Sequence, residues 1–287
     1  MKKKIEVLKT FVIIYLMALF ITISSCITSS KSNDGVIDAS IFPTLQSAFD
    51  ALPDNGGEVI IPPGVYELTE PLVLLNKENI HIRGAGPSSH IINRNEDGKP
   101  AIIIRPDNDD QNTYIWRIQI SDFRISGNEK SGDGLIADRV NELYITGLWV
   151  DHNGGHGIST VKCLEDARIN HCIITYNAKV GLFILGDHDI IVSANQFEEN
   201  QDAIHFIDAC NLTMTGNNID DHLRHGVVME NTYGGCLISG NMIEECQGTA
   251  IILDRSACGT TISGNAIAHN LGGGVDLRNS WGCSTIC

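Results

Sequence analysis

Three pairs of adjacent carboxylates, here called the acidic ladder, recur at intervals of 22 and 24 residues: Glu198-Glu199, Asp220-Asp221 and Glu244-Glu245. Carboxylates stacked above one another either share a cation or raise one another's pKa. The first outcome predicts a calcium site of hard oxygen ligands formed by Glu198, Glu199, Asp221, Glu244 and Glu245. The second predicts a catalytic acid at Asp220 or Asp221. A solvated acidic surface is the alternative interpretation.

The segment from Asp220 to His225 has the densest set of ionisable residues in the chain. Arg224 and His225 are predicted to lie beside Gln201 and Asp202 of the preceding repeat and beside Gly248 and Thr249 of the next one. A base and a cation at this place could remove a proton next to a carboxylate and stabilise the resulting charge. We therefore predict catalytic roles for Arg224 and His225 and a substrate-binding role for Asp202. Alternatively, both basic residues only offset the surrounding carboxylates.

The acidic pairs, and Asp202 with Arg224 and His225, can lie close together only if the segments between them fold into a regular repeat. A small residue followed by alternating apolar positions, here called the anchor, recurs at intervals of 22 to 24 residues. The anchors are Gly134, Gly157, Gly181, Ala203, Gly226, Ala250 and Gly274. Apolar residues follow most anchors at the first and third positions, which is the period of a strand. Two further apolar columns precede most anchors by seven and twelve residues, so each repeat has two or three short strands.

One such repeat cannot bury its own apolar residues, so the repeats must stack. This predicts an all-β solenoid, a parallel β-helix with coils of about 22–24 residues. Two columns of asparagine follow from the same alignment, one at Asn195, Asn217, Asn241 and Asn265 and the other at Asn153, Asn177, Asn200 and Asn270. Stacked amides can satisfy buried turn backbone, so we predict a structural role for both. His222 and Cys246 interrupt the second column.

The region before the anchors carries two informative segments. Thr44 precedes Leu45, Ala48, Phe49 and Leu52, which predicts a short helix that caps the solenoid. The stretches 56–66 and 79–86 follow, and with the repeats they resemble the pectate lyase and polygalacturonase superfamily of β-helical proteins. The resemblance spans most of residues 38–287. It implies a right-handed helix that binds polysaccharide along a groove on its flank.

Two shorter segments resemble motifs within that superfamily. Leu148-Trp-Val-Asp151-His152 is similar to a segment of one pectate lyase family, and Gly155-His156-Gly157 to a segment of polygalacturonases. The resemblance implies substrate-binding roles for Asp151, His152 and His156. It also implies either calcium bridging a uronate or paired aspartates. The arginine-proline motif of the lyase and the aspartate motifs of the hydrolase are absent from the sequence.

The N-terminus predicts export. Four lysines precede an apolar run that ends at Ile23-Ser-Ser-Cys26, which resembles a lipoprotein signal. We predict a signal peptide over 1–25, lipidation of Cys26, a polar tether over 26–37 and a β-helix over 38–287. Removing 1–25 takes away four lysines and one glutamate, so the net charge moves from −15 to −18. This acidity disfavours nucleic acid as a partner, and the membrane is contacted only through the lipid of Cys26.

Cysteines and the C-terminus give structural predictions. Cys236, Cys258 and Cys283 lie at similar phases of successive repeats and could pair, whereas Cys172 and Cys246 are predicted to pack as small buried residues. The last residues begin an eighth repeat, so a missing segment or a partner is expected to cover that edge.

We therefore predict an envelope-anchored protein acting on polysaccharide, with a pectate-lyase-like reaction on uronate-containing glycans. The alternatives are a non-catalytic glycan-binding or structural surface protein and a polygalacturonase-like hydrolase.

Overall fold

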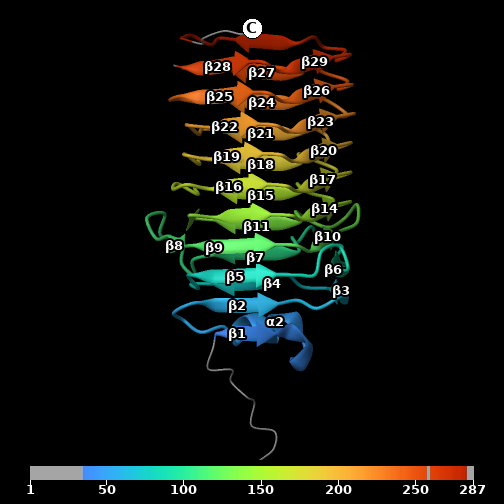
Figure 1. Ribbon diagram of the computed structural model, residues 1–287, viewed down its shortest axis with the longest axis vertical. Helices are drawn as coiled ribbons and strands as arrows, with labels where there is room; N and C mark the ends of the chain where they lie inside the picture. The colour runs from blue at the N-terminus through green and yellow to red at the C-terminus, as the bar shows by residue number, and fades with distance from the viewer. Residues whose placement is uncertain (1–34, 257–258, 283–287) are drawn as a thin grey trace, which may run out of the picture. The chain divides into compact units, whose positions relative to one another are not determined.

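Three parallel sheets run the length of the computed structural model, which describes residues 35–256 and 259–282 (Figure 1). Sheet A contains β1 (Val36–Asp38), β2 (Gly57–Ile60), β5 (Ile80–Arg83), β9 (Ile118–Ser121), β13 (Tyr144–Thr146), β16 (Arg168–Asn170), β19 (Ile191–Ser193), β22 (Thr213–Thr215), β25 (Cys236–Ser239) and β28 (Thr260–Ser263). Sheet B contains β3 (Gly64–Leu68), β6 (Ser89–Asn93), β10 (Arg124–Ser126), β14 (Trp149–Asp151), β17 (Ile173–Thr175), β20 (Gln196–Glu198), β23 (Asn218–Asp220), β26 (Met242–Glu244) and β29 (Ala266–Ala268).

Sheet C completes each coil. It contains β4 (Leu72–Leu75), β7 (Ile102–Arg105), β11 (Leu135–Asp138), β15 (Ile158–Val161), β18 (Leu182–Leu185), β21 (Ile204–Ile207), β24 (Val227–Glu230), β27 (Ile251–Asp254) and β30 (Val275–Arg278). The short strands β8 (Ile115–Trp116) and β12 (Val140–Asn141) pair separately. The chain visits A, B and C in turn, so the predicted parallel β-helix is confirmed, with three strands in each complete coil.

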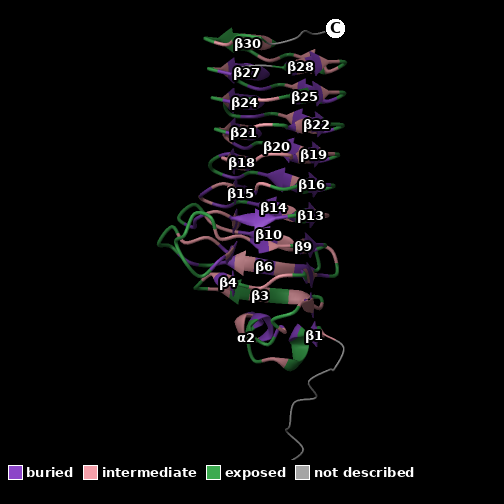
Figure 2. Ribbon diagram, turned by 90° about the vertical axis from the view of Figure 1, so that its left-hand side faces the viewer, coloured by how far each residue is buried: buried purple, intermediate pink, exposed green. Residues whose placement is uncertain are grey.

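The predicted apolar columns form the core. In sheet C the residue after each anchor pairs with its counterpart one coil away, as Leu182 does with Ile204, and both are fully buried (Figure 2). The residues at the third position after the anchors are also fully buried, from Ala137 through Leu253. Leu277 departs from this pattern because β30 is the last described strand of sheet C, and this side chain is 51% exposed.

The asparagine columns are hydrogen-bonded ladders. In the A–B turn, Asn217 Oδ1 accepts from the backbone N–H and the Nδ2 of Asn195, at 3.1 and 3.0 Å. Asn241 repeats both contacts toward Asn217. In the B–C turn, His222 interrupts the column without breaking it, because its Nδ1 accepts from the backbone N–H of Asn200 at 3.2 Å, where other rungs use an amide oxygen. The predicted structural role of the asparagines is thus supported.

The predicted capping helix is present as α2 (Leu45–Asp50), after the 3-10 helix η1 (Ala39–Ile41). Thr44 and Ser47 form a reciprocal capping box at its start, and Leu45, Ala48 and Phe49 are buried. Gln46 ties the helix to the backbone of Val73 in β4. In the described part of the chain, no helix has the length and apolar character needed to cross a membrane.

Three loops in the first coils interrupt the regular spacing. Residues 94–101 and 127–134 lead into β7 and β11, whereas 106–114 leaves β7, so the loops stand at opposite ends of the sheet C strands (Figure 1). Arg139 holds the third loop in place, since its guanidinium donates to the backbone carbonyls of Asp110 and Asn108 at 2.5 and 2.8 Å. This arginine is only 2% exposed, so the loop 106–114 is held by a buried side chain.

Several predictions concern residues outside the described ranges. These are the signal peptide, Cys26, most of the tether, and Cys258 and Cys283 as disulfide partners of Cys236. The strand β1 begins at Val36, inside the segment predicted as tether. Cys172 and Cys246 are buried and unpaired, as predicted.

Candidate functional site

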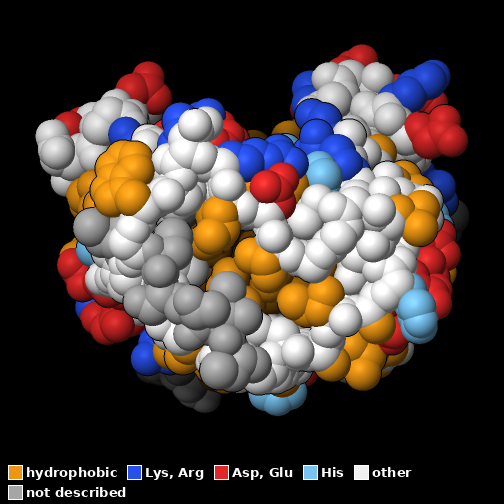
Figure 3. Space-filling view, turned by 90° about the horizontal axis from the view of Figure 1, so that it is seen from above, with side chains coloured by type: hydrophobic (Ala, Val, Ile, Leu, Met, Phe, Trp, Pro, Cys, Tyr) orange, Lys and Arg blue, Asp and Glu red, His pale blue; other side chains and the backbone are white. Residues whose placement is uncertain are grey.

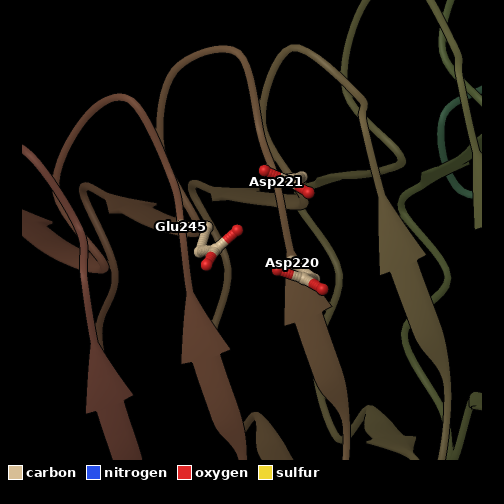
Figure 4. Close-up of side chains that lie close together, drawn as sticks. All are labelled: Asp220, Asp221 and Glu245. Carbon is tan, nitrogen blue, oxygen red and sulfur yellow. The ribbon is translucent and has the colours of Figure 1, made fainter.

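The acidic ladder lies where the strands of sheet B end and the B–C turns begin. Register in sheet B places Asp220 between Glu198 and Glu244 of the neighbouring coils. Asp221 follows in the left-handed conformation, with φ 54°, which turns its side chain toward Glu245 of the next coil (Figure 4). One oxygen from each of Asp220, Asp221 and Glu245 lies within 4.8 Å of the others. The structure therefore brings together part of the predicted cation site.

Electrostatics in the ladder follow from this crowding. Burial raises the pKa of Asp220, and the charges of Asp221, Glu244, Glu245 and Glu198 raise it further. Its Oδ1 is buried and has no hydrogen-bond partner among the described residues. A shared cation or a proton would each relieve this repulsion, so the geometry leaves both predicted roles open.

Asp151 and His152 occupy the same position three coils earlier but have different surroundings. Arg124 donates to both oxygens of Asp151, at 2.8 and 2.9 Å, and His152 contacts the same carboxylate. Burial opposes the shift, but the hydrogen bonds from Arg124 and His152 lower the pKa of Asp151. The ring of His152 stacks on Tyr176, with centroids 5.1 Å apart. Asp151 is thus already paired within the protein, which makes it a structural contact of sheet B.

Arg224 and His225 lie on the other side of the B–C turn, in front of sheet C. Asp202 is fully buried and accepts from Arg224 Nε at 2.8 Å and from the backbone N–H of His225 at 2.8 Å. His225 Nδ1 in turn accepts from the backbone N–H of Thr249 at 3.0 Å. The predicted neighbours Asp202 and Thr249 are both confirmed by these bonds. Because Nδ1 is an acceptor here, the proton of the neutral ring lies on Nε2.

His156 has the same arrangement three coils earlier. Asp133 Oδ1 accepts its backbone N–H at 2.8 Å, and its Nδ1 accepts from the backbone N–H of Val180 at 3.2 Å. Ser159 donates to the other oxygen of Asp133 at 2.6 Å. Burial lowers the pKa of His156 and of His225. Both rings are therefore held as neutral imidazoles with Nε2–H as the remaining polar atom.

A row of side chains on the outward face of sheet C was not predicted as a site. The rings of His156 and Phe183 stack with centroids 4.6 Å apart, and the ring of His205 meets Phe183 edge-on at 6.1 Å. His205 Nε2 lies 3.3 Å from Glu230, which also pairs with Arg255. A signal was present in the sequence, because Phe183 occupies an outward position two residues after its anchor, where a solvated strand normally has a small or polar residue.

The outward face of sheet C is flanked by protruding loops beside its first coils (Figure 2). Figure 3 looks along the stack and shows one side hollowed between two raised rims, with basic, acidic and histidine side chains gathered between them. Loops at both ends of the sheet C strands account for the rims. We call the outward residues of sheet C, with the residue just before each anchor, the sheet C face. It contains His156, Asp202 and His225 of the predicted residues, whereas the acidic ladder belongs to sheet B and its turns.

Comparison with known proteins supports this fold. Residues 101–267 match the family model described as a right handed beta helix region. No curated protein sequence matches the chain. Among solved structures, ORF18 of Geobacillus virus E2 superposes with a TM-score of 0.71 at 18% identity, over 86% of this chain and 60% of that one.

Two further structures are similar. Tailspike protein 2 of an Escherichia coli O157:H7 bacteriophage gives a TM-score of 0.66 at 12% identity, over 87% of this chain and 38% of the tailspike. The mannuronan C-5 epimerase AlgE6 A-module of Azotobacter vinelandii gives 0.52 at 16% identity, over 85% and 77% of the two chains. This chain thus spans less than two thirds of the first two proteins. At these identities the likeness concerns the fold, and the predicted right-handed helix is confirmed.

Proposed function

The chain belongs to the family of proteins with a right handed beta helix region, and we propose that it binds and processes a polysaccharide laid along the sheet C face. The observation that carries this proposal is the row of His156, Phe183, His205 and Glu230 along that face. Stacked rings offer an apolar platform for the faces of sugar rings, and the flanking polar groups can fix the orientation of a sugar.

Similar structures support a carbohydrate as the ligand. Their names describe a phage tailspike, a mannuronan C-5 epimerase and a DFA-IIIase in complex with DFA-III. The N-terminal signal predicted from the sequence would place this activity outside the cytoplasm, anchored to the envelope through Cys26. Together these points favour an external polymer over a cytoplasmic metabolite.

The reaction we propose is β-elimination from a uronate-containing glycan. Such a reaction needs a base for the proton next to the sugar carboxylate and a cationic group for the developing charge. Arg224 is exposed and positioned by Asp202, so its remaining N–H groups can receive that carboxylate. His225, with Nδ1 occupied by Thr249, is suited to donate from Nε2. In the proposed step, the proton next to the sugar carboxylate passes to solvent water as the base, and the electron pair of that C–H bond forms the double bond. The glycosidic oxygen leaves with the Nε2 proton of His225, which the ring then regains from solvent.

The proposal is tested with purified protein and a panel of polymers. Polygalacturonate and alginate are incubated with the protein, and unsaturated products are followed by ultraviolet absorbance while reducing ends are counted. Unsaturated products support elimination. Reducing ends alone would instead identify a hydrolase, and binding without either product would identify a glycan-binding module. Absence of both binding and cleavage across charged and neutral polymers overturns the proposal.

Phe183→Ala is expected to weaken polysaccharide binding about tenfold, because it removes the platform between two imidazoles, and aromatic contacts are worth about 0.5–1.5 kcal/mol. Isothermal titration calorimetry measures the effect. Tyr144→Ala, which removes an exposed aromatic ring from β13 in sheet A, is the matched control and should bind as the wild type does. Equal loss in both variants would contradict a specific role for the ring.

We further propose that the acidic ladder binds calcium at Asp220, Asp221 and Glu245. The approach of their oxygens to within 4.8 Å supports this proposal. Calcium at a hundred times its Kd is expected to raise the free energy of unfolding by about 2.7 kcal/mol. The gain should vanish in Asp221→Asn, which tolerates the left-handed backbone but removes the charge.

Differential scanning fluorimetry with calcium and then a chelator measures this stabilisation. Asp208→Asn is the control, since Asp208 is exposed and also has a positive φ of 51°. A calcium-induced shift of equal size in Asp221→Asn and the wild type would place the ion elsewhere.

A further inference from the structure

One three-coil unit occurs twice on the sheet C face. In the column just before the anchors, Asp133, His156 and Val180 occupy three successive coils, and Asp202, His225 and Thr249 occupy the next three. In each unit the Asp carboxylate accepts the backbone N–H of the His one coil later, at 2.8 Å. In each unit the His Nδ1 accepts the backbone N–H of the third residue, at 3.2 or 3.0 Å. The two units are 69 residues apart.

The hydrogen bonds give both histidines the same chemical state. A ring whose Nδ1 accepts a backbone N–H keeps its proton on Nε2. Among the described residues, Nε2 of neither ring has a hydrogen-bond partner. The two carboxylates, by contrast, are already satisfied, Asp133 by Ser159 and Asp202 by Arg224. Each unit therefore presents one free donor, the Nε2–H of its histidine, whereas its carboxylate is already hydrogen-bonded within the protein.

The surroundings of the two donors differ. His156 is stacked on Phe183, so a ligand group beside it meets an apolar ring. His225 adjoins Arg224, whose side chain is 48% exposed, so a ligand group beside it meets a positive charge. Neighbouring parallel strands are about 4.8 Å apart, so three coils separate the two donors by about 14 Å. A monosaccharide is too short to reach both.

We propose that His156 and His225 form two donor subsites for one extended glycan. Each histidine donates its Nε2–H to an acceptor oxygen of that glycan, so only a glycan long enough to reach both subsites gains both hydrogen bonds. This inference rests on the proposed function and deepens it, because it names the polymer's length and its acceptor groups as what the sheet C face recognises. The charge at Arg224 favours a carboxylate-bearing sugar at the second subsite and a neutral sugar face at the first.

The asparagine ladder indicates that histidine can be replaced by asparagine to test this inference. His222 occupies an asparagine position of the B–C ladder, and its Nδ1 accepts a backbone N–H as an asparagine oxygen does. Replacement of histidine by asparagine at 156 or 225 therefore keeps an acceptor for the next coil and removes only the outward donor. His222→Asn makes the same change at a buried position of the ladder and is the matched control.

Binding is measured by calorimetry with uronate oligomers of increasing length, starting from the disaccharide. The wild type is expected to bind tightly only above the length that reaches both subsites. His156→Asn and His225→Asn should each bind the long oligomer about tenfold more weakly, equivalent to about 1.4 kcal/mol, and lose the step with length. Melting temperatures should stay near that of the wild type, and His222→Asn should bind normally.

Three results would overturn the inference. If the wild type binds glycans but both asparagine variants keep the affinity and the length step, the histidines only support the fold and the proposed function survives. If the ring nitrogens give NMR signals of a protonated Nδ1 in either histidine at neutral pH, the donor state is wrong. A wild type that binds no oligomer of any length removes the proposed function and these subsites with it.

Discussion

Replacement of Asn217 by alanine is expected to lower the free energy of unfolding by about 3 to 5 kcal/mol. Its Oδ1 accepts the backbone N–H and the Nδ2 of Asn195, and its Nδ2 donates to the carbonyl of Val192 at 3.0 Å and to Asn241. Alanine leaves at least two donors and one acceptor without partners inside a turn that water does not reach. Each buried orphan costs about 1–3 kcal/mol, so the sum is large for a single side chain.

The matched control is the next residue along the chain. Asn218, the first residue of β23, points outward and donates to the side chain of Gln196 at 2.9 Å, so Asn218→Ala should cost no more than about 1 kcal/mol. Chemical denaturation followed by circular dichroism measures both. If the two variants unfold at the same denaturant concentration, the ladder does not contribute to stability in the way its hydrogen bonds indicate.

Asp187→Asn is expected to remove a strong pH dependence of stability. Asp187 is fully buried, and burial raises its pKa from an ordinary value of 3.8 to about 7. Its Oδ1 accepts the backbone N–H of Cys163 at 2.9 Å, and the hydroxyl of Thr160 also acts on this carboxyl, but burial outweighs both contacts. The folded chain therefore favours the protonated acid.

The sign follows from linkage. Between pH 4 and 7 the folded state holds a proton that the unfolded state has lost, so wild-type stability falls as pH rises through this window and then levels off. The loss is on the order of 4 kcal/mol, from about three pH units at 1.36 kcal/mol each. Asparagine keeps the oxygen that Cys163 needs and cannot ionise, so the variant should gain over the wild type as pH rises.

Urea midpoints across pH 4 to 8 measure the difference between variant and wild type. Asp189→Asn provides a contrast, because hydrogen bonds from Asn211 and then His188 outweigh a small burial effect and lower the pKa of Asp189. Its contribution is therefore lost at acidic pH. A constant difference between Asp187→Asn and the wild type at every pH would show that Asp187 is ionised throughout.

Most of the fold could be predicted from spacing alone. A repeat that places Ile, Val and Leu at alternating positions leaves one way to bury them, so the core columns from Leu135 to Leu253 were predicted residue by residue. The first coils were harder to delimit, because the loops 94–101, 106–114 and 127–134 break the interval there. Only the structure shows that Arg139 pins one of these loops.

The candidate site was predicted in part. Alignment placed Arg224 and His225 beside Asp202 and Thr249, and the contacts are confirmed. It could not show that the acidic ladder and Arg224 lie on different sides of one turn, because that depends on the left-handed backbone at Asp221. The resemblance to a pectate lyase segment implied a substrate role for Asp151, and the sequence did not show that Arg124 donates to both of its carboxylate oxygens. Such pairings depend on side-chain direction, which spacing does not report.

The unbroken register of sheet C has a consequence for how such a surface can change over generations. A duplicated or deleted coil of about 23 residues shifts everything beyond it by one rung and leaves the phase of every column intact. The distance between His156 and His225 can therefore be altered only in whole steps of about 4.8 Å. Insertion or deletion of whole coils can therefore change the spacing of the two subsites in fixed steps, while the side chains around each subsite stay the same.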